Sequence, residues 1–340
     1  MFQGPFDQVY RFYYQRLNLR QKQCYNTMVE HIMKYEKEFE LPCFISAQEV
    51  SEVFDAVRDD YPLFFFLNNH SWKTRGTTLY AVITYRILEK NVQPLLDKVI
   101  KEVTPLVNSL KGKTEEEKEL AIHDYLVTHS VYEKDRQYYV HQILGPILYH
   151  KSVCEGFARA GKMLFDLVGM RSAYVTGCGN CYKKTQEEKE KKNSNHAWNL
   201  VFIKNVPYYL DITFDAGLGK PDEIWYAYYN MSEEQILRNH LPAKPELANC
   251  PAGGDYYTVR GLYIQRKSQL RELVEKYLRA GKKTLMFRMD FSRPIEEITK
   301  NVVDVIREVC IQTPGRWWIK NYVVYEPQYI FCVRFYQMQK

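Results

Sequence analysis

Three residues far apart in the chain have the types that thiol-based acyl transfer requires. The first is Cys154, in the stretch "SVCEGFARAGKMLFDLVGM", whose apolar residues recur at helical spacing. This spacing predicts a helix with Cys154 in its first turn, on the stripe that faces the core. Ser152 and Glu155 stand three apart, as in a capping box, so we expect Ser152 to be the N-cap. The unpaired N–H groups and dipole of a helix start favour a thiolate and can stabilise an oxyanion.

The other two residues are His196 and Asp211. The stretches "NHAWNLVFI" and "PYYLDITF" predict two strands of a hairpin that turns near Lys204–Val206. A two-residue turn pairs positions whose numbers sum to an odd value, so His196 and Asp211 are expected on one face, within hydrogen-bond reach. An aspartate in an apolar strand is costly without a partner. The pattern therefore predicts a relay in which Asp211 orients His196, and His196 takes the proton of the Cys154 thiol.

Plainer interpretations compete with each of these signals. An isolated cysteine at a helix start is most often a small buried apolar residue. For Cys154, only the two predicted strands that carry His196 and Asp211 favour a catalytic role over this plainer interpretation. Cys178 and Cys181 have CxxC spacing, but no second pair of ligands completes a zinc site. A redox pair and a solvated turn stay open for these two cysteines, and we expect neither a metal nor a cofactor.

The motifs "VCEGFARA", "NHAWNLV" and "YYLDITFDAG" occur in this order and resemble the transglutaminase-like superfamily, most closely its bacterial members. The strict motifs cover roughly residues 120–215. The resemblance implies Cys154 as the nucleophile, His196 as the base and Asp211 as the acid. One departure is Phe214, where a tryptophan is common in the family. This change keeps an aromatic ring and leaves the triad intact.

Further site residues follow less directly from the sequence. Trp198 shares the predicted face of His196, so it is expected either to wall the substrate site or to pack in the core. Gln142 and Tyr149 lie in the segment before the cysteine, and either could supply the second oxyanion donor. The lysine- and glutamate-rich stretch 182–193 is predicted to be a solvated loop beside the site. The other histidines of the core are interpreted as packed or exposed side chains.

The expected fold class is α+β, with a papain-like, transglutaminase-type core. Residues 1–110 are predicted to form a mainly helical region with one strand near 77–87, and residues 111–245 the catalytic core. In the core, Thr114 and Glu117 have capping-box spacing before a helix. A linker rich in proline and glycine then leads to residues 246–340, where alternating patterns predict a small β-α-β-β domain.

Composition limits the possible partners. The net charge of +6 is spread among both signs, so no basic stripe for nucleic acid stands out, and no apolar run is long enough to span a membrane. The start of the chain lacks the pattern of a signal peptide, so a cytoplasmic protein is expected. The stretch "FQGP" resembles the scar of a tag-removal site, which keeps secretion open as an alternative. The oligomeric state is not indicated.

The expected function is acyl transfer or hydrolysis at amide bonds of proteins or peptides, through a thioester. Water as the acceptor gives a peptidase or amidase, and an amine gives a transglutaminase. The alternative is a binding or assembly module that uses the same fold without catalysis. Faster alkylation of Cys154 than of the other cysteines would favour the enzyme.

Overall fold

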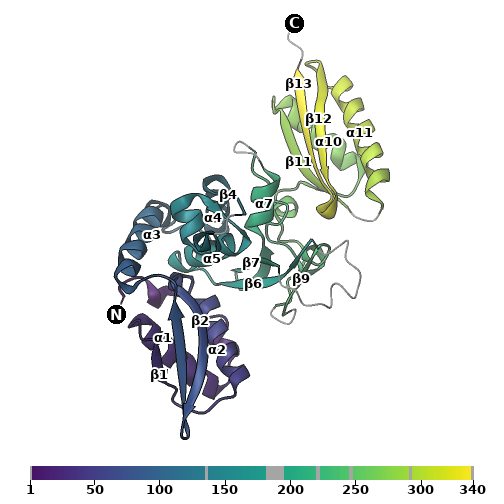
Figure 1. Cartoon of the computed structure of the whole chain (residues 1–340). Coiled ribbons are helices and arrows are strands. Elements are labelled where there is room, and N and C mark those ends of the chain that lie inside the picture. Colours follow the sequence, from purple (N-terminus) through teal and green to yellow (C-terminus); the bar gives the residue numbers. More distant parts are fainter. Residues whose placement is uncertain are drawn as a thin grey trace.

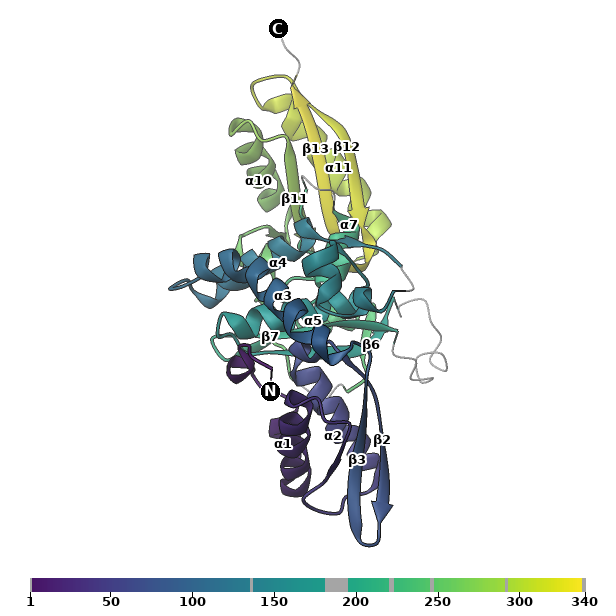
Figure 2. The same cartoon turned by 60° about the vertical axis from the view of Figure 1, so that its left-hand side comes forward.

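The computed structural model describes residues 2–134, 137–180, 195–219, 223–244, 248–290 and 293–337. Three bodies follow one another along the long axis of the molecule: an N-terminal lobe, a central core and a C-terminal domain (Figures 1 and 2). The stretch predicted as a charged loop, 182–193, lies outside the described residues. No helix among the described residues has the length and apolar character needed to cross a membrane.

The N-terminal lobe combines helices with a three-stranded antiparallel sheet in the order β1-β3-β2. Its elements are η1 (Phe6–Gln8), η2 (Tyr14–Arg16), α1 (Leu19–Met33), β1 (Glu38–Glu40), α2 (Ala47–Asp60), η3 (Pro62–Phe64), β2 (Leu67–Arg75), β3 (Thr78–Tyr85) and α3 (Glu89–Ser109). The sequence predicted β3 and the helices but missed β1 and β2. The reason is clear for β2, "LNNHSWKTR", because it is polar and largely exposed and so lacks apolar alternation.

This lobe and the central core share one continuous set of buried apolar side chains, which extends to Ile330 and Cys332, whereas the rest of the C-terminal domain has its own set. Polar contacts reinforce the first junction. The Tyr13 hydroxyl donates to the carbonyl of Tyr174 at 2.6 Å, and the Lys162 ammonium donates to the carbonyl of Tyr10 at 3.1 Å. The N-terminal lobe therefore packs as part of the body that carries Cys154.

The central core places helix α5 against a four-stranded sheet in the order β8-β7-β6-β9. Its elements are α4 (Glu115–His129), β4 (Val131–Tyr132), η4 (Tyr138–His141), the π turn η5 (Gly145–Tyr149), β5 (Lys151–Ser152), α5 (Cys154–Leu167), β6 (Ser172–Gly179), β7 (His196–Ile203), β8 (Val206–Leu210), α7 (Ile212–Leu218), α8 (Glu233–Ile236) and β9 (His240–Pro242). The predicted capping box of Thr114 and Glu117 starts α4. Close packing of α5 on β7 requires Gly161, since a Cβ there would lie 2.7 Å from the amide oxygen of Asn199.

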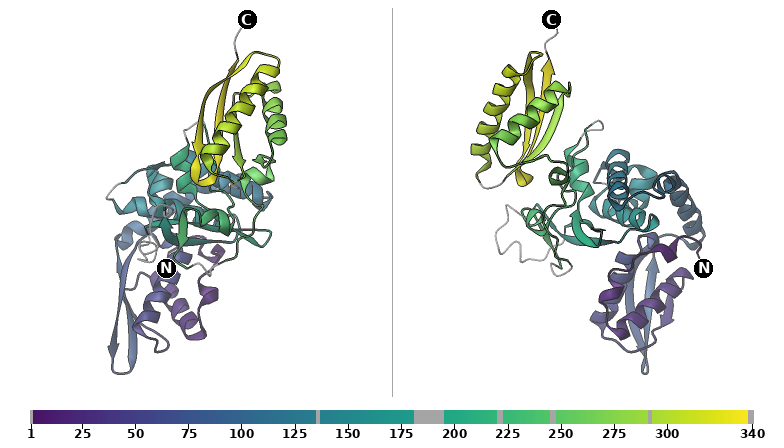
Figure 3. Two further views of the ribbon diagram at one scale, coloured as in Figure 1. Left: turned by 90° about the vertical axis from the view of Figure 1, so that its right-hand side faces the viewer. Right: turned by 180° about the vertical axis from the view of Figure 1, so that it is seen from behind.

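The C-terminal domain contains the predicted β-α-β-β unit with one strand and one helix in addition. Its sheet has the order β10-β11-β13-β12, and α10 and α11 pack against each other over one face (Figure 3). The elements from the linker onward are α9 (Tyr256–Val259), β10 (Tyr263–Ile264), α10 (Lys267–Arg279), β11 (Thr284–Met289), α11 (Ile295–Gln312), β12 (Trp317–Tyr325), η8 (Glu326–Gln328) and β13 (Ile330–Gln337). The fold is thus α+β, as expected.

A buried ion pair fastens this domain to the linker before it. The Arg288 guanidinium is fully buried, lies 2.7 Å from the Asp255 carboxylate and donates to the carbonyl of Ala227 at 3.0 Å. Asp255 in turn caps α9. This contact joins β11 to segments of the preceding body.

Replacing Arg288 by methionine is expected to lower the free energy of unfolding by about 3–5 kcal/mol, because Asp255 is left as an uncompensated buried charge. Urea unfolding measures the loss. The matched control is Arg271→Met, since Arg271 pairs with Glu308 at the exposed surface of the same domain. That change should cost less than about 1 kcal/mol. Equal losses for the two variants would contradict the assignment of Arg288 as a fastening residue.

Candidate active site

Cys154 is the first residue of α5, and the helix start differs from its prediction. The N-cap is Val153, not Ser152, and no side chain caps the helix. The Ser152 hydroxyl instead donates to the carbonyl of Val140 at 3.1 Å, because Ser152 belongs to β5 and faces the packed segment before the helix. The N–H groups of the first turn are therefore left without a side-chain acceptor beside the partly exposed thiol.

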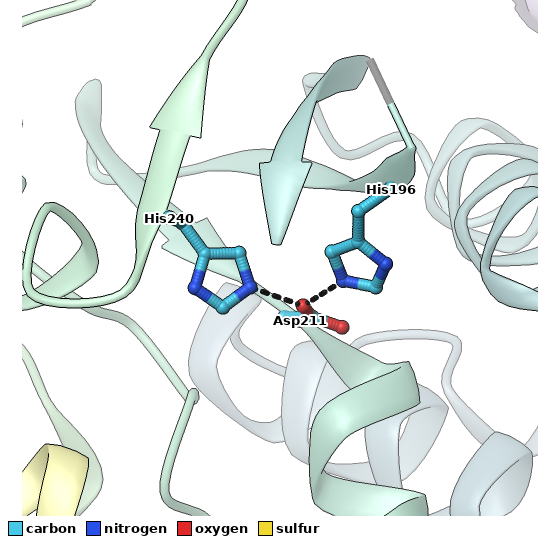
Figure 4. Close-up of side chains that lie close together, drawn as sticks. All are labelled: His196, Asp211 and His240. Atoms are coloured by element: carbon cyan, nitrogen blue, oxygen red, sulfur yellow. Dashed lines mark hydrogen bonds and ion pairs between the residues drawn. The ribbon is translucent and has the colours of Figure 1, made fainter. Parts of the chain in front are cut away.

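His196 and Asp211 meet as predicted, although Asp211 does not lie in a strand. β8 ends at Leu210, and Asp211 is the N-cap of α7, where its Oδ1 accepts the backbone N–H of Phe214 at 3.1 Å. Its Oδ2 lies 2.5 Å from Nε2 of His196, at the start of β7. Figure 4 shows the His196 ring directed at this carboxylate. The predicted strand "PYYLDITF" is thus wrong after Leu210, since the carboxylate starts a helix there.

A second histidine, His240 of β9, also contacts the acid. Its Nε2 lies 3.0 Å from the same Oδ2 of Asp211, on the side opposite His196 (Figure 4). Its Nδ1 lies 2.8 Å from the side-chain oxygen of Asn239, and the Asn239 amide bonds the hydroxyl of Tyr228. The Tyr228 hydroxyl is 2.7 Å from that of Tyr325, in the C-terminal domain. No sequence pattern indicated His240, which stands alone before a proline-rich linker.

The protonation of this cluster follows from its burial and its charges. Burial would raise the pKa of Asp211, but the His196 charge and the hydrogen bonds from both histidines hold it well below its usual range. Burial would lower the pKa of His196, but Asp211 and a hydrogen bond with Cys154 raise it well above its usual value. Burial lowers the pKa of His240, against the hydrogen bond and charge of Asp211, which raise it. The arrangement therefore favours an Asp211 carboxylate facing a His196 imidazolium.

Cys154 and His196 line one pocket of about 500 Å³, hereafter the Cys154 pocket. Because Nε2 of His196 is bound to Asp211, Nδ1 is the ring nitrogen left for the thiol. Tyr132 of β4 also lines this pocket, and its pKa is raised by burial and by the charge of Cys154. Tyr132 belongs to no sequence motif and was not among the predicted site residues.

A second pocket, of about 680 Å³, also borders His196 and is hereafter the His196-side pocket; Tyr132, Lys134 and Asn195 line both pockets. Phe214 lines it from the core, edge to face with the His196 ring at 4.9 Å between ring centroids. The turn between β12 and β13 closes it from the C-terminal domain, through Tyr325 and Glu326. The C-terminal domain thus supplies one wall next to His196.

Comparison with known proteins identifies the part of the chain that carries this geometry. The family model of the transglutaminase-like superfamily matches residues 104–226. This segment is a transglutaminase-like core. It contains Cys154, His196 and Asp211, and the match ends before the C-terminal domain begins.

Among solved structures, similar chains include the crystal structure of a TGase, at 15% identity and a TM-score of 0.30, covering 52% of this chain and 50% of that one. Another is a candidate cysteine protease from Cytophaga hutchinsonii, at 15% identity and a TM-score of 0.27, covering 43% of this chain and 61% of that one. The chain thus spans half to about six tenths of these two proteins. No curated protein matches the sequence.

The other residues singled out from the sequence have various positions in the transglutaminase-like core. Trp198 is buried beneath the His196 ring, at 5.6 Å between ring centroids, and does not line the Cys154 pocket. Gln142 lines a neighbouring pocket instead, and Tyr149 lies at the surface against Tyr139. Cys178 is disulfide-bonded, whereas Cys181 lies outside the described residues.

A buried ion pair that the sequence analysis missed supports α7. His123 of α4 lies 3.1 Å from the carboxylate of Asp215 and 2.9 Å from that of Asp124. Asp215 also accepts the backbone N–H of Tyr228 at 3.1 Å. These contacts hold the helix that begins at Asp211. His123 had been interpreted only as a packed or exposed side chain, because its partner is 92 residues away.

His196, Asp211 and His240 are also a possible set of metal ligands by type and proximity. Ligands of a tetrahedral zinc ion at about 2.0–2.2 Å stand roughly 3.3 Å or more apart. The 2.5 Å between His196 and Asp211 is shorter than this and matches a charge-assisted hydrogen bond. The described geometry therefore fits a proton relay better than a metal centre.

Proposed function

We propose that the transglutaminase-like core is an enzyme that transfers or hydrolyses acyl groups of amides through a thioester on Cys154. The observation that carries this proposal is the shared pocket of Cys154 and His196, with His196 bound through Nε2 to the buried Asp211. This arrangement supplies a nucleophile, a base and an orienting acid in the required order. Proteins or peptides are the expected substrates.

At the start of the first half of the reaction, the proton of Cys154 resides on Nδ1 of His196, so the sulfur is a thiolate beside an imidazolium. The thiolate attacks the amide carbonyl carbon, and the carbonyl oxygen becomes an oxyanion. When the tetrahedral intermediate collapses, the C–N bond breaks and His196 gives its proton to the departing amine. Asp211 stabilises the imidazolium during these steps and does not itself take the proton.

In the second half, an acceptor attacks the thioester carbon and His196 takes the acceptor's proton. Collapse breaks the C–S bond and releases the Cys154 thiolate, while the proton stays on His196 and restores the starting ion pair. Water as the acceptor releases a carboxylic acid, whereas an amine gives a new amide. The leaving amine and the acceptor must both lie beside His196, which makes the His196-side pocket their expected place.

The oxyanion requires two donors aimed at the carbonyl oxygen. The uncapped backbone N–H of Cys154 is one candidate. We assign the second to the Tyr132 hydroxyl, because Tyr132 lines the pocket of both Cys154 and His196. Gln142 and Tyr149 are not among the residues lining that pocket.

Replacing Tyr132 by phenylalanine is expected to lower kcat by about 100-fold, through the loss of one oxyanion donor. The steady-state rate on an accepted peptide measures this, and the alkylation rate of Cys154 should change much less, since alkylation forms no oxyanion. Tyr336→Phe, a half-exposed tyrosine of the C-terminal domain, is the control. An unchanged kcat for Tyr132→Phe would remove Tyr132 from the mechanism.

The deciding experiment incubates the protein with glutamine-containing peptides, with and without a primary amine, and follows peptide mass and ammonia release. A gain of one mass unit with ammonia release indicates hydrolysis of the side-chain amide, an amine adduct indicates acyl transfer, and shortened peptides indicate a peptidase. Cys154→Ala is the control and should give none of these. If wild type and Cys154→Ala behave alike on all peptides, the fold serves as a binding module instead.

A further inference from the structure

A third pocket, of about 360 Å³, adjoins the Cys154 pocket and carries an excess of basic groups. We call it the arginine pocket. Its basic side chains are Arg58, Arg86, Arg159 and His141, and Glu155 is the one carboxylate among its described lining residues. His141 and Glu155 line the Cys154 pocket as well. The two pockets therefore share a wall formed by His141 and Glu155, and Glu155 directly follows Cys154 in the sequence.

Two of the arginines are partly neutralised by nearby carboxylates. Arg58 lies 3.0 Å from Asp55 and 3.1 Å from Asp59. Arg159 is only 4% exposed and lies 3.6 Å from both Asp59 and Glu155, longer than a direct hydrogen bond. Its Nε has no hydrogen-bond acceptor within the described part of the chain. An unsatisfied buried guanidinium nitrogen at the wall of a pocket is costly unless a ligand supplies the acceptor.

The remaining positive charge comes from Arg86 and His141. Arg86 bonds the side-chain oxygen of Asn68 at 2.5 Å and lies over the Tyr138 ring, and no described carboxylate pairs with it. His141 lies 2.8 Å from Glu155, whose hydrogen bond raises the histidine's pKa. Glu155 is thus shared between His141 and Arg159, and Arg86 has no counter-charge among the residues that the structure describes.

We propose that the arginine pocket binds a carboxylate of the acyl donor, with Arg86 and Arg159 as its ligands. This inference rests on the proposed function. The leaving amine takes its proton from His196, which lines the Cys154 pocket and the His196-side pocket but not the arginine pocket. The acyl part of the substrate accordingly extends from Cys154 toward the arginine pocket, past Glu155 and His141. The carboxylate is either an acidic side chain or the free C-terminus of a peptide, since both present the same fork to a guanidinium.

The test uses full-length protein with Cys154→Ala and measures peptide binding by isothermal titration calorimetry. The probes are acetylated tetrapeptide amides around one glutamine, with glutamate or its isostere glutamine at each other position in turn. A further pair ends in a free carboxylate or in an amide. At least one acidic peptide is expected to bind about tenfold more tightly than its neutral partner. The side-chain and C-terminal pairs show which source the pocket prefers.

Arg86→Gln should abolish this tenfold preference, so that each acidic peptide binds no more tightly than its neutral partner. Arg75→Gln removes an exposed charge from the same lobe, where Arg75 pairs with Glu38, and should leave the preference intact. Equal binding of all acidic and neutral partners, or an equal loss in both variants, would overturn the proposal. Alkylation of Cys154 in wild type and His196→Ala tests the enzyme separately. A carboxylate preference without a reactive Cys154 would thus retain the pocket and reject the enzyme.

Discussion

Replacing His196 by alanine is expected to slow the alkylation of Cys154 at neutral pH by tenfold or more and to abolish turnover. The raised pKa of His196 keeps the ring protonated through neutral pH, so it can pair with a thiolate there. In wild type, the rate of reaction with iodoacetamide should therefore change little between about pH 6 and 8. Without His196, the rate should rise with pH as for an ordinary thiol, whose pKa is roughly 8.5. Intact mass and peptide mapping follow the label.

Two internal comparisons sharpen this experiment. Cys43 has the same intermediate exposure as Cys154 but no histidine partner among its hydrogen bonds, so its labelling should be slow and indifferent to His196. His129→Ala removes an exposed histidine at the end of α4 and should leave the labelling of Cys154 unchanged. If Cys154 and Cys43 react alike in every variant, the proposal of a working Cys–His pair fails.

Replacing Asp211 by asparagine should lower kcat by about 10³–10⁴-fold while the protein stays folded. The carboxylate fixes the tautomer of His196 through Nε2 and stabilises its charged form, and an amide can do neither well. Asparagine is a good N-cap, so it can still accept the Phe214 N–H at the start of α7. The variant therefore separates the proton relay from the helix cap. Turnover of an accepted glutamine peptide gives the activity, and thermal unfolding checks the fold.

The pH profile of the same variant gives a second result. Without the carboxylate, the charge that raises the pKa of His196 is lost while its burial stays, so the imidazolium form should be confined to lower pH. The basic limb of the profile, where the imidazolium loses its proton, should therefore move to lower pH. Activity within tenfold of wild type, with an unmoved profile, would show that Asp211 is only a structural cap.

The fold was predictable where local patterns carry it. Thr114 starts its helix as the capping box indicates, and α5 follows its apolar stripe. Two features failed for physical reasons. β2 is polar, and it is held in the sheet by its pairing with β3 rather than by burial of an apolar face. Ser152 matched a capping pattern, but in the folded chain its hydroxyl donates to the carbonyl of Val140 instead of capping the helix.

The site was predictable to the extent that its partners lie on adjacent elements. His196 and Asp211 came together because a short turn, Lys204 and Asn205 with positive φ, fixes the register of β7 and β8. His240 was missed because β9 reaches Asp211 only by pairing with β6 across the sheet. Arg86 was missed likewise, since its pocket joins the N-terminal lobe to the core. Long-range contacts of this kind leave no periodic trace in one sequence.

The hydrogen-bonded path that starts at Asp211 has a consequence for the evolution of this chain. It passes through His240, Asn239 and Tyr228 to Tyr325, so the acid beside His196 is held partly by a domain outside the family match. A lineage that lost this domain would give up one wall of the His196-side pocket and the far end of this support together. We therefore predict that, among related chains, substitutions at Tyr325 and at His240 are inherited as a pair.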